Sequence, residues 1–237
     1  MKWMFIALLW GVSWGCLALE VGPLVHEIQS DAAVRSTKVM VRNNSAATQL
    51  VDAQVMQLHF EPDGYSASPA TRDDLIVMPP AFRIAPGRSQ VLMLMWTGTA
   101  PLKTSQSYSV QLSAMNQDTE NQRNHIAIQI NYNVIVHVAS GQHQERLQST
   151  PISVRQTPNG IDFMVQNLGS KYTKLSHYDL SFSSPGQNQP EILTGDLIAN
   201  SESDAFIPAG QTTEIHLPKA LLSGRTFGQV TLKKRQP

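Results

Sequence analysis

Hydrophobic and polar residues alternate with a period of two along most of the chain. Clear examples are residues 50–58, 91–96 and 110–112. Side chains two positions apart on a strand share one face, so this alternation predicts β-strands with one buried face. Turn-forming pairs such as Asn43-Asn44 and Asn159-Gly160 separate the segments, and after residue 18 no apolar stripe of helical period reaches the length of a helix. The pattern therefore predicts an all-β fold.

The predicted strands fall into two sets. The first set is residues 19–28, 36–42, 48–60, 75–78, 89–97, 106–115 and 125–138. Seven strands in about 120 residues are typical of an immunoglobulin-like sandwich. A polar stretch at 139–144 lacks the alternation and is interpreted as a linker. The second set is residues 150–156, 160–167, 173–183, 191–198, 212–217 and 227–234. We therefore expect two immunoglobulin-like β-sandwich domains, residues 19–139 and 140–237, joined by a short hinge with a cleft between them.

The first 18 residues have the layout of a cleaved secretory signal peptide. Lys2 precedes an apolar run at 3–12, and Cys16-Leu17-Ala18 places small residues at the −3 and −1 positions. The run is shorter than the roughly 20 apolar residues of a spanning helix, so no stable membrane insertion is expected. A lipoprotein signal ending at Cys16 is the alternative, but Trp14 fits such a signal poorly. We expect export and cleavage after Ala18.

Composition removes several classes of function. Cys16 is the only cysteine, so the exported chain would contain neither disulfides nor cysteine-based metal or catalytic sites. Basic and acidic residues balance at 18 each, which does not favour binding to nucleic acid or to an anionic membrane.

An enzyme is the first alternative class. The seven histidines show neither the i, i+4 helical spacing nor the HExxH pattern of zinc hydrolases, and we interpret them as surface or loop residues. Ser107 and Ser109 lack the G-x-S-x-G elbow of a serine hydrolase. We therefore expect no catalysis, no metal and no cofactor.

The longest strand-like run is residues 126–138, in which every even position is large and apolar. At about 3.3 Å per residue its 13 residues extend for roughly 43 Å, whereas the mean strand has about five or six residues. Proteins normally suppress long alternating edge strands because these strands pair with other chains. The run is therefore interpreted either as a strand offered to a partner or as a long core strand paired within its own domain.

Several segments in order resemble the periplasmic chaperones of pilus and fimbrial assembly. Residues 74–87, DLIVMPPAFRIAPG, are similar to the family's segment l-x-v-x-P-P-x-f-r-l-x-P-G. Further similar segments are 19–23, 39–44, 107–112, 165–169, 208–212 and 217–218. Together they cover essentially the whole exported chain.

The resemblance implies a binding mechanism and a location. Chaperones of the chaperone–usher pathway lend the last strand of their first domain to a subunit that lacks a strand, which is donor-strand complementation. Matched onto this chain, the lent side chains are Ile126, Ile128 and Ile130. The implied location is the periplasm, and the implied partners are pilus subunits and an outer-membrane usher. A homodimer that caps its own long strand is an alternative state of the free chaperone.

The chain departs from the better-known members of the family at the cleft. Those members pair an Arg of the first strand with a Lys of the last strand to hold the subunit's C-terminal carboxylate. Residues 24–27 contain neither cation, and the Lys position falls on Asn133. We expect Asn131 and Asn133, with His26 or His137, to hold the subunit's C-terminus as neutral donors. This departure indicates a divergent branch, and a cation elsewhere (Arg35, Lys38 or Arg42) is the rival anchor.

A structural or adhesive β-sandwich protein of a cell-surface fibre is the second alternative class. Such proteins share the sandwich fold, so the fold alone does not decide between the two. A pilin usually has one domain, and the two-domain layout and the resemblance along the whole chain favour the chaperone.

Overall fold

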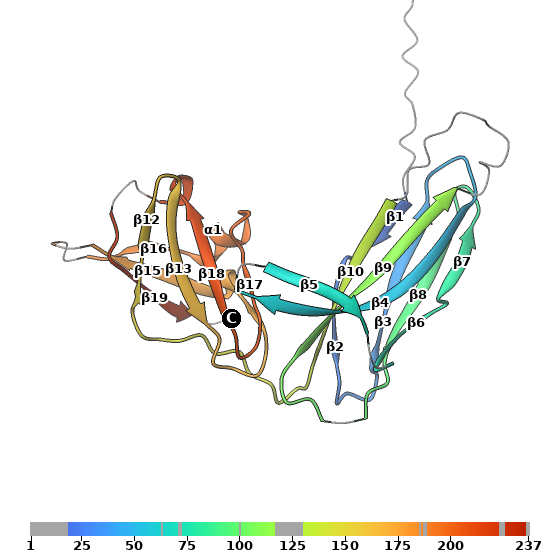
Figure 1. Ribbon diagram of the computed structural model, residues 1–237, viewed down its shortest axis with the longest axis horizontal. Coiled ribbons are helices and arrows are strands. Elements are labelled where there is room, and N and C mark those ends of the chain that lie inside the picture. The colour runs from blue at the N-terminus through green and yellow to red at the C-terminus, as the bar shows by residue number, and fades with distance from the viewer. Residues whose placement is uncertain are drawn as a thin grey trace, which may run out of the picture.

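The computed structural model describes residues 19–62, 64–70, 73–99, 101–116, 130–184, 186, 189–222 and 226–235. It shows two β-sandwiches arranged as the arms of a V, which confirms the all-β, two-domain fold (Figure 1). Within these residues, no helix has both the length and the apolar character needed to cross a bilayer.

The N-terminal sandwich consists of two sheets. The outer sheet has the strand order β1 (Leu19–Gly22), β3 (Ser36–Asn43), β8 (Ser89–Trp96) and β6 (Leu75–Met78). The inner sheet has the order β2 (Val25–Gln29), β10 (Ile130–Ala139), β9 (Gln106–Asn116), β4 (Gln49–Glu61) and β5 (Gly64–Pro69), and β7 (Ala81–Ile84) also pairs with β4. Val39, Leu92, Leu112 and Val136 are fully buried between the two sheets.

The C-terminal sandwich is smaller. One sheet has the order β11 (Ile152–Ser153), β19 (Gln229–Lys234), β15 (Tyr178–Ser183) and β16 (Glu191–Leu193). The second has the order β12 (Arg155–Thr157), β13 (Gly160–Gln166) and β18 (Thr212–Pro218), and β14 (Thr173–Lys174) pairs with β17 (Phe206–Ile207). The helix α1 (Gly195–Ala199) and the 3₁₀ turns Leu175–His177 and Lys219–Leu221 complete the described elements. Its core is a separate cluster that includes Phe163, Phe182 and Ile215.

Four predicted strands differ in the structure. The strand predicted at 150–156 forms β11 and β12, and the strand predicted at 173–183 forms β14, a 3₁₀ turn and β15. The strand predicted at 19–28 divides at Pro23 into β1 and β2, which belong to different sheets. Proline has no backbone N–H for a ladder, so the chain changes sheets there. The strand predicted at 191–198 ends at Leu193 and continues as α1, because a short apolar run does not by itself distinguish strand from helix.

Two buried asparagines occupy equivalent places in the two domains. Asn43 is the last residue of β3. Its Nδ2 donates to the carbonyls of Ala47 at 2.7 Å and Ile84 at 2.9 Å, while its Oδ1 accepts from Ser45 N at 2.9 Å. Asn167 follows β13 and donates in the same way to the carbonyl of Lys171 at 2.9 Å. Both residues are fully buried, where water cannot reach the backbone groups of these loops. The asparagine amides form the hydrogen bonds that those backbone groups need.

Candidate functional site

The strand β10 presents one apolar and one polar face. Its even positions face the core, and the fully buried Val136 is an example. Its odd positions, Asn131, Asn133, Ile135 and His137, lie on the opposite face of the inner sheet. The predicted alternation of this strand is therefore confirmed for residues 131–138.

Serines of β9 hold the polar side chains of β10. The Ser113 hydroxyl donates to Asn131 Oδ1 at 2.9 Å, and the Ser109 hydroxyl donates to Asn133 Oδ1 at 3.4 Å. Each asparagine thus turns its carbonyl oxygen toward β9, and neither Nδ2 donates to another described residue. Because both side chains are exposed, two amide NH₂ groups on one face are available to a ligand.

Half of β10 is a free sheet edge in the described part of the chain. Its parallel pairing with β2 covers only Ile135 to Ala139, whereas its antiparallel pairing with β9 starts at Ile130. Among the described strands, residues 130–134 therefore have a neighbour on one side only. A free edge of this kind presents backbone N–H and C=O groups to which another strand can pair.

The predicted donor residues cannot be placed fully. Ile126 and Ile128 lie outside the described residues. Ile130 begins β10 and pairs with Ala114 through its backbone, but its side chain is not among those described. The assignment of these three residues stays a prediction.

The structure does not bring His26 together with Asn131 and Asn133. His26 pairs with Val136 across the parallel strands, so both side chains point to the core side of the inner sheet. Its Nδ1 lies 2.9 Å from Thr37 Oγ1, and its Nε2 lies 3.0 Å from the Pro23 carbonyl oxygen.

His137 lies in the junction between the domains, and the expectation that every histidine is a surface or loop residue is wrong here. It is 6% exposed and contacts two rings of the C-terminal domain, with centroid distances of 4.3 Å to Tyr172 and 4.8 Å to Phe206. Ser107 Oγ lies 2.8 Å from its Nδ1. Burial disfavours the charged imidazolium and lowers the pKa of His137 to about 4. Sequence reasoning missed this burial because the covering residues belong to the other domain.

Glu27 ties the inner sheet to the C-terminal domain. Lys171 Nζ lies 2.8 Å from its Oε1, and the Tyr172 hydroxyl donates to its other oxygen. Burial raises the pKa of Glu27, but hydrogen bonds from Lys171 and Tyr172 outweigh this effect, and the pKa is lowered. A backbone hydrogen bond of 2.9 Å from Glu214 N to the Pro62 carbonyl forms a second link between the domains.

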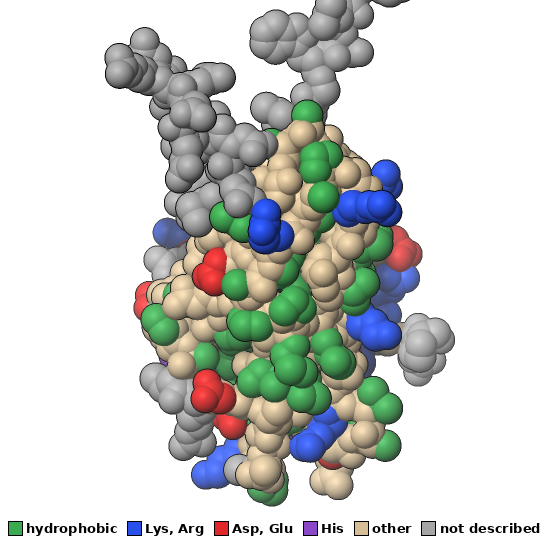
Figure 2. Space-filling view, turned by 90° about the vertical axis from the view of Figure 1, so that its right-hand side faces the viewer, with side chains coloured by type: hydrophobic (Ala, Val, Ile, Leu, Met, Phe, Trp, Pro, Cys, Tyr) green, Lys and Arg blue, Asp and Glu red, His purple; other side chains and the backbone are tan. Residues whose placement is uncertain are grey.

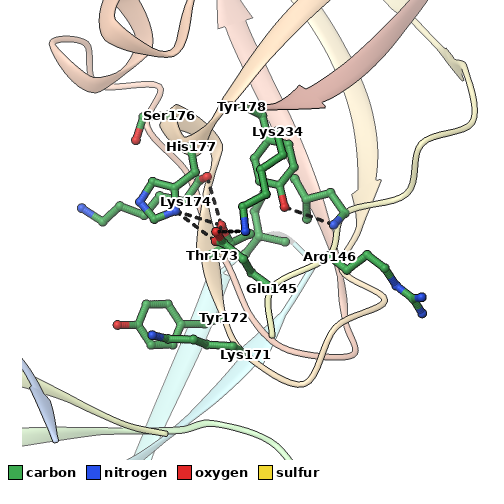
Figure 3. Close-up of polar contacts among 12 residues, drawn as sticks. Glu145, Arg146, Lys171, Tyr172, Thr173, Lys174, Ser176, His177, Tyr178 and Lys234 are labelled. Carbon is green, nitrogen blue, oxygen red and sulfur yellow. Dashed lines mark hydrogen bonds and ion pairs between the residues drawn. The ribbon is translucent and has the colours of Figure 1, made fainter. Parts of the chain in front are cut away.

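A second polar cluster fixes the linker to the C-terminal domain (Figure 3). Glu145 accepts from Lys234 Nζ at 2.7 Å and from the Thr173 hydroxyl, and its Oε2 lies 3.0 Å from His177 Nδ1. Burial raises the pKa of Glu145, but the hydrogen bonds from Lys234, Thr173 and His177 outweigh it and lower the pKa to about 2. An adjoining cavity of about 330 Å³ is lined by Glu27, Glu145, Lys171 and Lys234 among others. Lys171 forms an ion pair with Glu27, and Lys234 forms one with Glu145.

The inner sheet offers little positive charge to a ligand. The strands β2, β10, β9, β4 and β5 contain neither Lys nor Arg. Arg83 is on β7, opposite Leu50 at the far side of the sheet. Of the rival anchors, Lys38 and Arg42 are exposed on β3 of the outer sheet, and Arg35 donates to the Gly98 carbonyl at 3.2 Å. In the described part of the chain, no group of three or more His, Cys, Asp or Glu side chains is arranged to hold a metal ion.

Comparisons with known proteins agree with this architecture. Residues 25–138 match the sequence model of the pili and flagellar-assembly chaperones, PapD N-terminal domain. No curated protein matches the chain in sequence. The first domain therefore matches the pili and flagellar-assembly chaperones over nearly its whole length. The resemblance found in the sequence is confirmed.

Solved structures share the fold of the whole chain. The Class 5 fimbriae chaperone CfaA has a TM-score of 0.62 and 15% identity, over 93% of each chain. A chain from a chaperone–tip adhesin complex of CFA/I fimbriae biogenesis has a TM-score of 0.61 and 16% identity, over 93% of this chain and 92% of that one. The CsuC–CsuE chaperone–tip subunit complex of archaic Csu pili from Acinetobacter baumannii gives a TM-score of 0.57 and 15% identity, over 90% and 91%.

Proposed function

We propose that this protein is a periplasmic chaperone that holds pilus or fimbrial subunits by donor-strand complementation and delivers them to an outer-membrane usher. The family of the first domain and the two-domain fold support the chaperone role. Two of the similar structures are of chaperones in complex with a tip adhesin or tip subunit, which supports a fibre subunit as the partner.

The free edge of β10 at residues 130–134 is the observation that carries the proposal. A subunit strand that pairs with this edge gains main-chain hydrogen bonds without displacing a described strand of the chaperone. Without a subunit, the same edge is available to a second copy of the chain, which is the proposed route to a self-capping homodimer.

The lent side chains are Ile126, Ile128 and Ile130. They continue the even-numbered apolar series of β10 in the N-terminal direction. Burial of each in the groove of an incomplete subunit would contribute about 1.5–3 kcal/mol. The combined free energy from three such side chains is large enough to keep an incomplete subunit sandwich folded.

Asn131 and Asn133 bind the C-terminal segment of the subunit. Both residues are exposed, and their Nδ2 groups make no hydrogen bond to another described residue, while Ser113 and Ser109 orient the amides. Neutral amide donors bind a carboxylate or a carbonyl less strongly than a cation does. His26 lies on the other face of the sheet, so it is not part of this proposed binding site.

Co-expression tests the proposal. The chaperone is expressed with a small secreted β protein encoded beside its gene, and soluble periplasmic β protein is compared with and without the chaperone. We expect accumulation only with the chaperone, in a complex of one copy of each. If the chain copurifies instead as part of a self-complementing fibre, it is a structural fibre protein. N-terminal sequencing of the same extract should give Leu19 as the first residue, and a lipid-modified Cys16 would contradict export as a free periplasmic protein.

A further inference from the structure

The outer sheet carries an exposed apolar surface on the side away from the core. Met40, Met78, Val91 and Met93 are 50%, 40%, 49% and 37% exposed, and we call these four residues the methionine patch. Met40 is the cross-strand neighbour of Val91, and Met78 is that of Met93, so the patch is continuous over β3, β8 and β6. Figure 2 views the molecule from the side away from the C-terminal domain and shows hydrophobic side chains gathered at the middle of that face.

The patch is not a consequence of a loosely packed core. The intervening positions of the same strands, Val39, Val41, Leu92 and Leu94, face inward and are fully buried. Polar residues on the outward positions would serve this sheet equally well. Continuous exposed apolar surface usually marks an interaction site, and flexible, polarisable methionine side chains suit surfaces that adapt to a partner.

Basic residues border the patch. Lys38 lies opposite Met93, Arg42 lies two residues after Met40 on the same face of β3, and Arg88 precedes β8. All three are exposed, and none forms an ion pair with another residue that the structure describes. Glu20 of β1 is the cross-strand neighbour of Arg42, so this border holds three cations and one carboxylate. The surface therefore combines an apolar centre with a border that is positive overall.

We propose that the methionine patch docks a partner protein that presents apolar side chains flanked by carboxylates. Apolar contacts would supply the affinity, and the carboxylates would pair with Lys38, Arg42 and Arg88 and orient the partner. The patch lies on the opposite sheet from β10, so the partner and a subunit held at β10 would bind at the same time. The inference is independent of how the subunit is held.

The same charges argue against two other occupants. A second copy that docked through the same patch would place like charges against each other, which is unfavourable. A lipid surface is favoured by interfacial Trp or Tyr and by clusters of four to eight cations. The patch has three bordering cations and no aromatic side chain.

A designed peptide tests this surface directly. The probe is a fluorescein-labelled peptide with four central leucines and three glutamates at each end, and its counterpart carries lysines in place of the glutamates. Fluorescence anisotropy of the full chain should show binding of the glutamate peptide and at least about tenfold weaker binding of the lysine peptide. The double variant Met40→Ser with Met93→Ser, and separately Lys38→Gln with Arg42→Gln, should each weaken binding of the glutamate peptide by about tenfold or more.

Met164→Ser is the matched control, because Met164 is 42% exposed on β13 of the C-terminal domain. This variant should bind the glutamate peptide as the wild type does. Equal binding by the patch variants and the wild type overturns the proposal, as does equal binding of the two peptides. Patch-dependent binding to phosphatidylglycerol vesicles without peptide binding would identify a membrane surface instead, and a patch-dependent dimer in sedimentation would identify a second copy.

Discussion

The imidazole of His137 lies nearly parallel to the ring of Phe206, with an interplanar angle of 13° and a centroid distance of 4.8 Å. His137 belongs to β10 of the N-terminal domain, and Phe206 belongs to β17 of the C-terminal domain. The strand that is proposed to hold the subunit therefore also carries a central contact of the domain junction. A substitution at this junction should therefore also affect how β10 binds a subunit at the cleft.

Acidification should destabilise the junction through His137. Burial lowers its pKa from 6.5 to about 4, so between these values the unfolded chain binds a proton that the folded chain does not. The free energy of unfolding should therefore fall as pH decreases, by at most about 1.4 kcal/mol per pH unit. Urea unfolding between pH 6.5 and 5 measures this slope. The lowered pKa values of Glu27, Asp31 and Glu145 reduce stability only below about pH 4.5.

Replacing His137 with an aromatic residue that does not titrate should remove this dependence of the free energy of unfolding on pH. His137→Phe keeps an aromatic side chain between Tyr172 and Phe206 and should give nearly constant stability over the same interval. The matched control is His59→Phe, because His59 is exposed and contacts Ser68. A slope that survives in His137→Phe and disappears in His59→Phe would contradict this assignment.

Asn43 should be far more important for stability than its neighbour Asn44. Asn43→Ala removes the two hydrogen bonds from its buried Nδ2 to the carbonyls of Ala47 and Ile84, and it removes the acceptor of the Ser45 N–H. Loss of these hydrogen bonds should reduce the free energy of unfolding by about 2–4 kcal/mol. Asn44→Ala removes only an exposed contact to Glu20 and should change it by less than about 0.5 kcal/mol. Equal effects in denaturant unfolding would show that the loop does not depend on the buried amide.

Subunit binding should depend only weakly on salt. The inner sheet strands beside the cleft carry no Lys or Arg, and hydrogen bonds from neutral amides are screened less than ion pairs are. Asn133→Ala should weaken the complex by about 1 kcal/mol, the scale of one neutral hydrogen bond. Asn133→Lys should make the affinity clearly salt-dependent. Titration calorimetry at low and moderate salt separates the variants, with the exposed Asn200→Ala of the C-terminal domain as the control.

A steep loss of wild-type affinity with salt would contradict the neutral cleft. Lys38 and Arg42 belong to the outer sheet, so a charged clamp would then have to come from another part of the chain.

Local patterns were enough to predict the fold, because alternation and turn residues are properties of neighbouring positions. The strands β3, β8 and β18 lie within one or two residues of their predicted ranges. The strand β5, Gly64–Pro69, was not predicted because its sequence, GYSASP, has no alternation. It forms as an edge strand through pairing with β4, and such pairing is not encoded in its own residues.

The candidate site was only partly predictable for a related reason. The alternation of β10 placed Asn131 and Asn133 on one face, but their orientation depends on Ser113 and Ser109, which are distant in sequence. His26 was assigned to the same cleft from its position in the chain. The change of sheet at Pro23 and the register of β2 against β10 place it on the other face.

The central claim is that the apolar residues preceding β10 complete an unfinished subunit. The double variant Ile126→Asp with Ile128→Asp removes the apolar side chains that would fill the subunit's groove. Ile192→Asp is the matched control, because Ile192 is 62% exposed on β16 of the C-terminal domain.

Soluble periplasmic subunit, quantified by co-expression with each chaperone variant, is the decisive measurement. We predict that the double variant folds normally but leaves the subunit at the level found without any chaperone, whereas Ile192→Asp supports the wild-type level. A double variant that accumulates as much subunit as the wild type would contradict donor-strand complementation by these residues.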